Sequence, residues 1–163
     1  MSASSAAADK PTLDGSCHCG AVKFAAKSVD LADVCRCNCS ICNISGRVGV
    51  PVKDGDLFVV KSDGSQFPLH IDSDRSEFPP GQSVYGRRHT QHHFCNKCGI
   101  HVFSVSDVPS FGIYIGVNVL CLDLKKIGVD IKDVSHPSKV TYCDGRSDTW
   151  ERRKGEPWPG GAW

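Results

Sequence analysis

The sequence lacks any apolar run that approaches the ~20 residues needed for a helix to span a bilayer. It also lacks a long amphipathic helical pattern, an internal repeat and a large excess of charge of one sign. The net charge is +1, and charged residues make up 23% of the chain. The densest basic stretches, residues 87–88 and 152–154, are typical of a solvated surface. These absences exclude a membrane-spanning protein and give no indication of nucleic-acid binding.

The N-terminus has neither a basic n-region nor an apolar h-region, so it does not read as a secretory signal. We therefore expect a cytoplasmic protein, with the nucleus as the alternative location. A chain of 163 residues is long enough for one domain with a core of its own. We place that domain at residues 13–151, between a flexible N-terminal tail at 1–12 and a C-terminal tail at 152–163 that is rich in Pro and Gly. The sequence does not indicate an oligomeric state.

Short alternating apolar segments predict a mainly β protein. We expect strands at residues 21–26, 31–37, 47–52, 57–61, 66–71, 83–86, 91–94, 101–105 and 111–117. Residues 40–46 read as one helical turn, and 72–82 as an exposed loop. Residues 119–124 are expected to continue the sheet, and 139–143 to form a last edge strand.

Ten cysteines are present, and eight of them lie in closely spaced groups. In a reducing compartment such spacing favours metal binding over disulfides. Cys17 and Cys19, together with Cys95 and Cys98, provide four thiolates from distant parts of the chain. Four thiolates complete a tetrahedral zinc site, so we interpret this set as structural.

The central stretch holds Cys35, Cys37, Cys39 and Cys42. The last three supply three thiolates from one short segment, and three protein ligands with an open fourth position are typical of a catalytic zinc. Side chains alternate along an extended chain, so Cys35 points to the same side as Cys37 and can close the site as a fourth ligand. The sequence leaves both readings open. Cys121 and Cys143 stand alone and read as buried core thiols.

Three segments resemble the signatures of one family. They are residues 15–24 (GSCHCGAVKF), 37–42 (CNCSIC) and 92–99 (HHFCNKCG). They are similar to the glutathione-dependent formaldehyde-activating enzyme (GFA) family, which also includes centromere protein V. Residues 116–123 and 144–151 resemble later segments of the family, so the likeness extends over residues 13–151.

This resemblance implies a zinc-bound β-tent fold, in which antiparallel sheets are stacked around two zinc sites. It implies two Zn²⁺ per chain: a structural zinc held by Cys17, Cys19, Cys95 and Cys98, and a second, catalytic zinc held by Cys37, Cys39 and Cys42. The implied activity is that of a carbon–sulfur lyase that reversibly joins glutathione and formaldehyde as S-(hydroxymethyl)glutathione. The implied partner is a small thiol such as glutathione.

A proton carrier is needed beside such a zinc, and His92 is the first candidate and His93 the second. Each can instead pack structurally. Two other functions remain open. One is a zinc enzyme that performs an elimination or hydrolysis on a secondary metabolite. The other is a zinc-stapled binding module without catalysis, as in centromere protein V, although the long basic extension of that protein is missing here.

Overall fold

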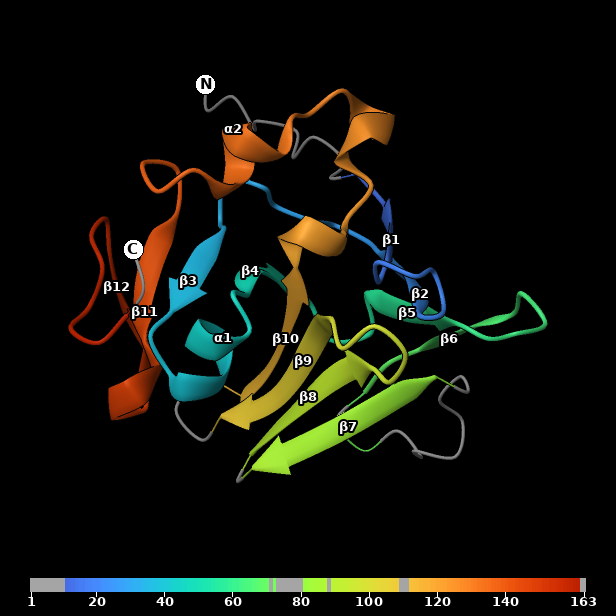
Figure 1. Ribbon diagram of the computed structural model, residues 1–163, viewed down its shortest axis with the longest axis horizontal. Coiled ribbons are helices and arrows are strands. Elements are labelled where there is room, and N and C mark those ends of the chain that lie inside the picture. The colour runs from blue at the N-terminus through green and yellow to red at the C-terminus, as the bar shows by residue number, and fades with distance from the viewer. Residues whose placement is uncertain (1–10, 71, 73–80, 88, 109–111, 162–163) are drawn as a thin grey trace, which may run out of the picture.

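The computed structural model describes residues 11–70, 72, 81–87, 89–108 and 112–161. The tail expected at residues 1–12 falls almost entirely outside these ranges, as does most of the loop expected at 72–82. The described chain forms two β-sheets, and its short helices connect strands of the larger one (Figure 1). The prediction of a mainly β protein is therefore confirmed.

The smaller sheet has four antiparallel strands in the order β1-β2-β5-β6. Their bounds are β1 (Leu13–Ser16), β2 (Lys23–Ala26), β5 (Leu57–Val60) and β6 (Gln66–Pro68). β1 and β2 form a hairpin, and the turn between them carries Cys17 and Cys19. The smaller sheet thus presents one of the predicted cysteine pairs at its end.

The larger sheet has eight strands in the order β12-β11-β3-β4-β10-β9-β8-β7. Their bounds are β3 (Cys35–Cys37), β4 (Val48–Val52), β7 (Gln82–Arg87), β8 (Thr90–Cys95), β9 (His101–Val108), β10 (Gly112–Asn118), β11 (Thr141–Asp144) and β12 (Thr149–Lys154). All neighbours are antiparallel except β11 and β3, which run parallel. Two of the central cysteines, Cys35 and Cys37, therefore lie on a strand in the interior of this sheet, and the other two follow it.

Within the described residues the helices are short: α1 (Ser40–Ile44), α2 (Ile131–Ser135) and three 3-10 turns, η2 (Val119–Cys121), η3 (Leu124–Ile127) and η4 (Gly145–Ser147). In the described residues, no helix has the length and apolar character required to cross a membrane. The helical turn expected at residues 40–46 corresponds to α1.

Two expectations at the C-terminal end are wrong. Residues 119–124 do not continue the sheet, because the Asn118 side chain accepts a hydrogen bond from the Leu120 amide at 3.2 Å and turns the chain into η2. The strand expected at 139–143 is present as β11, but it is not an edge strand, since β12 pairs with it on the outside. β12 also crosses the expected domain boundary at residue 151.

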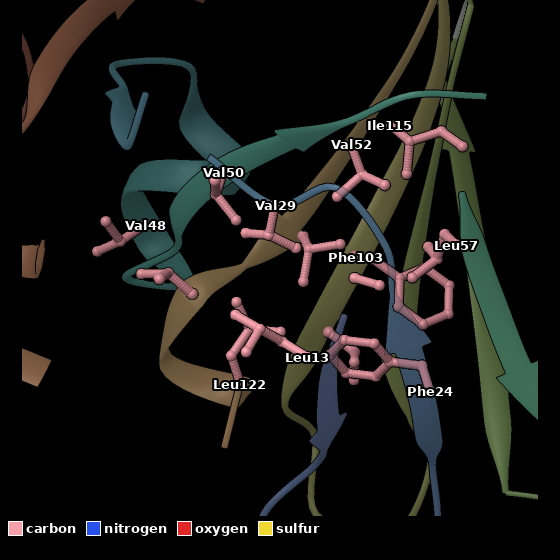
Figure 2. Packing of buried hydrophobic residues seen from close by; sticks show 14 of the residues in the cluster. Leu13, Phe24, Val29, Val48, Val50, Val52, Leu57, Phe103, Ile115 and Leu122 are labelled. Atoms are coloured by element: carbon pink, nitrogen blue, oxygen red, sulfur yellow. The ribbon is translucent and has the colours of Figure 1, made fainter. Parts of the chain in front are cut away.

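The apolar core lies between the two sheets (Figure 2). Phe24 of β2 and Phe103 of β9 meet edge to face, with ring centroids 5.7 Å apart. Val48, Val50 and Val52 of β4 are buried in the same cluster. Burial of these side chains is the main stabilising contribution of the sheets, at roughly 25 cal/mol per Å² of apolar surface.

The other face of the larger sheet carries the site described below. Side chains alternate between the two faces of a strand. On β9, Phe103 and Val105 belong to the core cluster, whereas Ser104 and Ser106 line a cavity on the opposite side. On β10, Ile115 belongs to the core and Tyr114 to the cavity wall. One sheet therefore holds the core on one face and a cavity on the other.

Candidate metal centres and the adjoining cavity

The first cysteine group joins the two sheets. Cys17 and Cys19 lie in the β1–β2 turn, Cys95 ends β8, and Cys98 lies in the turn before β9. Their four Sγ atoms all lie within 4.8 Å of one another. The structure thus brings together the two pairs that the sequence assigned to one site.

The spacing of this group fits a tetrahedral metal site. The Cys19 Sγ lies 3.6 Å from the Cys17 Sγ and 3.6 Å from the Cys95 Sγ. Zn–S bonds of about 2.3 Å place the sulfurs of a tetrahedral site about 3.8 Å apart. The Val22 amide donates to the Cys17 Sγ at 3.3 Å, and a backbone hydrogen bond from Ile100 is the main cause that lowers the pKa of Cys98 to about 6. These bonds favour the thiolates that a metal requires.

The two turns have a common backbone feature. Gly20 follows Cys19 with a φ of 74°, and Gly99 follows Cys98 with a φ of 73°. This left-handed conformation is adopted by glycine without the strain that a Cβ introduces. Each pair of cysteines is therefore held on a tight turn that leads into the next strand.

The second group lies on a single segment. Cys37 ends β3, Cys39 is the N-cap residue of α1, and Cys42 lies within α1. Their Sγ atoms lie within 4.8 Å of one another. The Cys39 side chain makes no capping hydrogen bond, and the Cys39 amide donates to the Cys37 Sγ at 3.4 Å. This segment directs three sulfurs to one point, as the spacing predicted.

Three sulfurs at this spacing do not readily ionise together. Contact with Cys143 is the first cause that raises the pKa of Cys37, and contact with Cys37 is the first cause that raises the pKa of Cys39. The pKa of Cys42 is lowered, mainly because the thiols of Cys37 and Cys39 donate hydrogen bonds to its sulfur. A cation among the sulfurs removes this conflict, so the donor set fits a metal that prefers thiolates.

The loop around the second group is held by Asn38. Its buried side chain donates to the Asp144 carboxylate at 2.7 Å and accepts from the Arg146 amide at 2.9 Å. These bonds tie the segment between Cys37 and Cys39 to the end of β11. The geometry of the three sulfurs therefore depends on the C-terminal part of the chain.

Gly145 leaves the space that Cys37 occupies. A Cβ at this position would lie 2.3 Å from the Cys37 Sγ and 2.6 Å from the Trp150 Nε1. We therefore expect Gly145→Ala to displace Cys37 and to weaken metal binding at the second group by about tenfold or more, while the first group keeps its metal. Competition with a chelator of known affinity measures both sites.

Gly155→Ala is the matched control, because, apart from its two chain neighbours, no described residue has an atom within 4 Å of a Cβ built at Gly155. It is expected to leave both affinities unchanged. Equal affinities for Gly145→Ala and Gly155→Ala would show that the second group does not depend on this close contact.

A cavity of about 420 Å³ adjoins the second group. All three of its cysteines line this cavity, and side chains of β4, β8, β9, β10, β11 and β12 complete the wall. Pro51, Val108 and Trp150 supply apolar surface, and Thr90, Ser104 and Ser106 supply hydroxyl groups. A volume of this size is within the range of small-molecule sites.

Arg47 is the buried cation of the cavity. It precedes β4, and its Nη1 lies 3.7 Å from the Cys42 Sγ. Burial acts to lower the pKa of Arg47, but the nearby Cys42, Tyr114 and Cys35 groups raise it above its ordinary value. Sequence reasoning passed over Arg47, because a single arginine after a helical turn carries no local signal of burial.

His92 lies in the cavity wall on β8. Its Nδ1 lies 3.3 Å from the Nε2 of His101, and the His101 Nδ1 lies 3.3 Å from the Ser45 hydroxyl. Burial is the main cause that lowers the pKa of both rings, to about 3 for His101. The sequence identified His92 but not His101, which lies nine residues away on the neighbouring strand.

His93, the second candidate proton carrier, lies on the other face of β8. It is fully buried, its ring centroid is 4.8 Å from that of Phe103, and its Nδ1 lies 2.6 Å from the Gln82 Nε2. It is not among the residues that line the cavity. The alternation of side chains along the strand thus separates the two neighbouring histidines.

The buried His101 has a consequence for stability. Its pKa is about 3 in the folded protein, against an ordinary value of 6.5. Between these values the unfolded chain binds a proton that the folded protein does not, so the free energy of unfolding falls as the pH is lowered below 6.5. When the pH is lowered from 7 to 5, we expect the free energy of unfolding to fall by about 2 kcal/mol more in wild type than in His101→Gln.

Denaturant unfolding of the metal-loaded protein at both pH values measures this difference. The exposed His136 offers the control, and His136→Gln should follow wild type. A His101→Gln variant with the pH dependence of wild type would contradict the assignment of a neutral His101.

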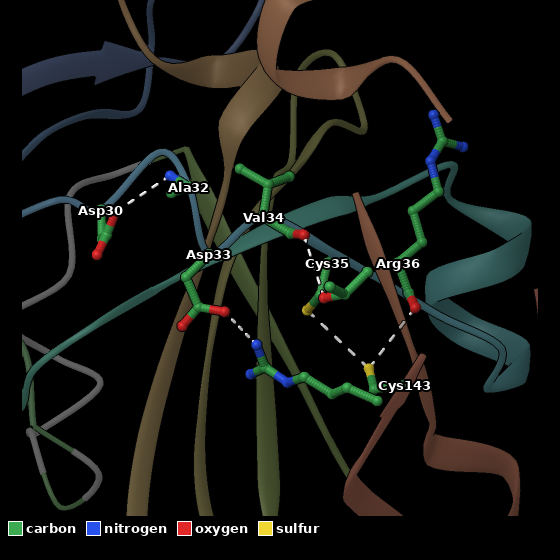
Figure 3. Close-up of polar contacts among 9 residues, drawn as sticks. Asp30, Ala32, Asp33, Val34, Cys35, Arg36 and Cys143 are labelled. Atoms are coloured by element: carbon green, nitrogen blue, oxygen red, sulfur yellow. Dashed lines mark hydrogen bonds and ion pairs between the residues drawn. The ribbon is translucent and has the colours of Figure 1, made fainter. Parts of the chain in front are cut away.

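Cys35 is not a member of the second group, and instead lies beside Cys143 (Figure 3). The two residues lie on the parallel strands β3 and β11, with their sulfurs 4.0 Å apart. The Cys143 thiol also donates to the Arg36 carbonyl at 3.6 Å. The hydrogen bond from the Cys143 thiol to the Cys35 sulfur is the first cause that lowers the pKa of Cys35 to about 7. The positive charge of Arg153, which pairs with Asp33, is a further cause.

The prediction that Cys143 is a buried thiol is confirmed, and the structure adds its location. Cys143 is buried, but it belongs to the cavity wall and not to the apolar core cluster. Sequence spacing gave no sign of its contact with Cys35, because the two residues are 108 positions apart.

Comparison with known proteins agrees with the motifs. The family model described as glutathione-dependent formaldehyde-activating enzyme matches residues 12–145. Among solved structures, the crystal structure of a Rhodobacter sphaeroides protein, determined as a Northeast Structural Genomics target, is 28% identical in sequence. The match covers 79% of this chain and 98% of that chain, with a TM-score of 0.52. Among curated proteins, no significant match was found.

Proposed function

Because the chain belongs to the glutathione-dependent formaldehyde-activating enzyme family, we propose that it is a zinc-dependent carbon–sulfur lyase-type enzyme. It acts on glutathione or a related thiol adduct in the cavity beside Cys37, Cys39 and Cys42. The reaction is the reversible joining of the thiol to formaldehyde, or to another small carbonyl compound. The two sheets then correspond to the β-tent arrangement around two zinc ions.

Zinc is the metal that best suits both donor sets, since sets of three and four cysteine thiolates are typical of it. Cys17, Cys19, Cys95 and Cys98 would hold the structural ion, and Cys37, Cys39 and Cys42 the second. When bound at the second set, zinc would supply positive charge that holds a thiol as its thiolate.

The cavity is the observation that carries the proposal. All three cysteines of the second group line it, so a small molecule in the cavity has access to them. Three thiolates leave one tetrahedral position without a protein ligand. Cys35, which the sequence left open as a fourth ligand, contacts Cys143 instead.

The chemistry requires a proton carrier. When the thiolate sulfur forms a bond to the carbonyl carbon, the electron pair of the C=O double bond moves to the oxygen, which then takes a proton. His92 is the cavity-lining residue suited to carry that proton, because burial lowers its pKa and keeps the ring neutral, so that it can accept the proton that the thiol releases and pass it to the oxygen. The apolar wall of Pro51, Val108 and Trp150 reduces the access of water.

The second candidate function is a zinc enzyme that performs an elimination or hydrolysis on a secondary metabolite. Three thiolates make the metal complex net negative, and this favours binding of a thiol over strong activation of water. The cavity also favours an enzyme over a binding module that is merely stapled by metal. The domain in this proposal includes β12 and therefore extends to Lys154.

Exchange of ¹³C-formaldehyde with glutathione, followed by NMR on the zinc-loaded protein, tests the proposal. We expect the rate of S-(hydroxymethyl)glutathione formation to rise in proportion to protein concentration. His92→Gln is expected to reduce this rate by about 10²-fold, within the range for loss of a general acid–base group. A rate equal to the uncatalysed one, with two zinc ions bound, would refute the formaldehyde reaction.

A further inference from the structure

Arg47 holds unused hydrogen-bond donors inside the cavity. Its residue exposure is 9%, and its Nε and Nη2 atoms have no hydrogen-bond partner among the described residues. A buried guanidinium with unmade hydrogen bonds costs free energy in the folded protein. Nη1 lies 3.7 Å from the Cys42 sulfur, where it balances the charge of the thiolates. This contact uses only one of the three guanidinium nitrogens and leaves Nε and Nη2 without a role.

The sheet is built to receive this guanidinium. A Cβ at Gly116 would lie 2.1 Å from the Arg47 Nη2, and a Cβ at Gly49 would lie 3.3 Å from the same atom. These glycines lie on the neighbouring strands β10 and β4, and neither has a positive φ that requires glycine. The missing side chains therefore serve to make room for Arg47, which lies over the two strands.

The backbone also fixes the start of the Arg47 side chain. Gly46 follows the C-cap residue of α1 with a φ of 64°, and the Arg47 amide donates to the Cys42 carbonyl at 3.0 Å. The Arg47 backbone is thus held beside Cys42, and the contact between Nη1 and the Cys42 Sγ places the guanidinium at the second cysteine group. Such preorganised donors are suited to stabilise charge that develops during a reaction.

We propose that Arg47 is a catalytic residue that binds an anionic oxygen of the substrate close to its sulfur. This inference rests on the proposed function, because it takes the thiol sulfur to lie beside Cys37, Cys39 and Cys42. In the joining reaction the oxygen is the one that receives the C=O electron pair, two bonds from the sulfur. Nε–H and Nη2–H can donate to it in a paired arrangement.

The position of Arg47 limits the class of ligand. A sulfur in the fourth tetrahedral position would lie about 3.8 Å from the Cys42 Sγ, and Nη1 lies 3.7 Å from that same atom. An oxygen that reaches Arg47 must then be separated from the sulfur by only a few bonds. Short thiols with a carboxylate near the sulfur meet this requirement and should act as analogues of the reacting adduct.

Calorimetry on the zinc-loaded protein tests this with two probes, mercaptoacetate and the neutral 2-mercaptoethanol. We expect wild type to bind mercaptoacetate about tenfold or more tightly than 2-mercaptoethanol, since a hydrogen bond between charged groups is worth about 1.5–3 kcal/mol. Arg47→Met should lose this preference and keep its affinity for 2-mercaptoethanol, whereas Arg47→Lys should keep part of the preference.

Arg153→Met is the matched control. Arg153 also lines the cavity, but its guanidinium pairs with Asp33. This variant should retain the preference of wild type. In the exchange assay, Arg47→Met should lower kcat with little change in KM, because the oxyanion exists only after the sulfur has attacked.

The outcomes separate the two claims. If both thiols bind equally to wild type and to Arg47→Met, the role of Arg47 is wrong and thiol binding at the second group stands. If neither thiol binds to wild type, the proposed function fails and the inference fails with it. If Arg47→Met is poorly folded, the comparison of wild type with Arg47→Lys decides, because a lysine retains the charge without the paired donors.

Discussion

Replacing Cys95 by serine is expected to leave the chain largely unfolded. Cys95 is buried, ends β8 and lies 3.6 Å from Cys19 of the other sheet. Serine is nearly isosteric with cysteine, so the loss reflects the missing thiolate and not a packing cavity. Binding of a structural zinc is worth roughly 10–16 kcal/mol in small zinc domains, which is comparable to the whole stability of a domain, about 5–15 kcal/mol.

Far-UV circular dichroism and denaturant unfolding in the presence of zinc measure the effect. We expect Cys95→Ser to lose at least about 5 kcal/mol of its free energy of unfolding. Cys121→Ser is the control, because Cys121 belongs to neither cysteine group. A Cys95→Ser protein with the stability of Cys121→Ser would contradict a structural role for the first group.

Replacing Cys39 by serine is expected to have the opposite pattern, with the fold retained and catalysis lost. Cys39 is the N-cap residue of α1, with an extended backbone at φ −63° and ψ 153°, and its side chain makes no capping bond. Serine is one of the preferred N-cap residues. Cys39→Ser therefore preserves or improves the start of the helix while it removes one of the three thiolates.

Metal analysis and the exchange assay should show the effect together. Zinc content should fall from two ions per chain to one, and the rate should fall to the uncatalysed level. Cys35→Ser is the matched control, since Cys35 lies near in sequence but outside the second group; it should retain both ions. Loss of an ion from Cys35→Ser, with none lost from Cys39→Ser, would reverse the assignment of these two residues.

The parts of the structure that depend on local sequence were predicted best. The alternation of Val48, Val50 and Val52 indicated β4, and the spacing of Cys37, Cys39 and Cys42 indicated that their sulfurs converge. Both features follow from the geometry of a few consecutive residues. The meeting of the Cys17 and Cys95 turns was predicted because four thiolates complete a site, and the structure brings them together.

The parts that depend on distant partners were not predicted. The sequence of β11 does not reveal that β12 covers it on one side or that β3 runs parallel to it on the other. Residues 119–124 are apolar enough for a strand, but the Asn118 side chain turns the chain instead. Arg47 was missed for a similar reason, because the space for its side chain is left by Gly49 of β4 and Gly116 of β10.

The distinction between His92 and His93 shows what the fold adds to a motif. Both precede Cys95, and the sequence ranked them only by position. In the sheet, His92 lines the cavity and contacts His101, whereas His93 packs against Phe103. The role of His92 as a proton carrier stays a prediction, but the geometry now favours it clearly over His93.

A crystal structure of the zinc-loaded protein with glutathione tests the central claim most directly. We expect one zinc within about 2.3 Å of the Cys37, Cys39 and Cys42 sulfurs, with the glutathione sulfur as fourth ligand at a similar distance. A zinc in that place whose fourth ligand is the sulfur of Cys35 or Cys143 would contradict it, because no position would remain for a substrate.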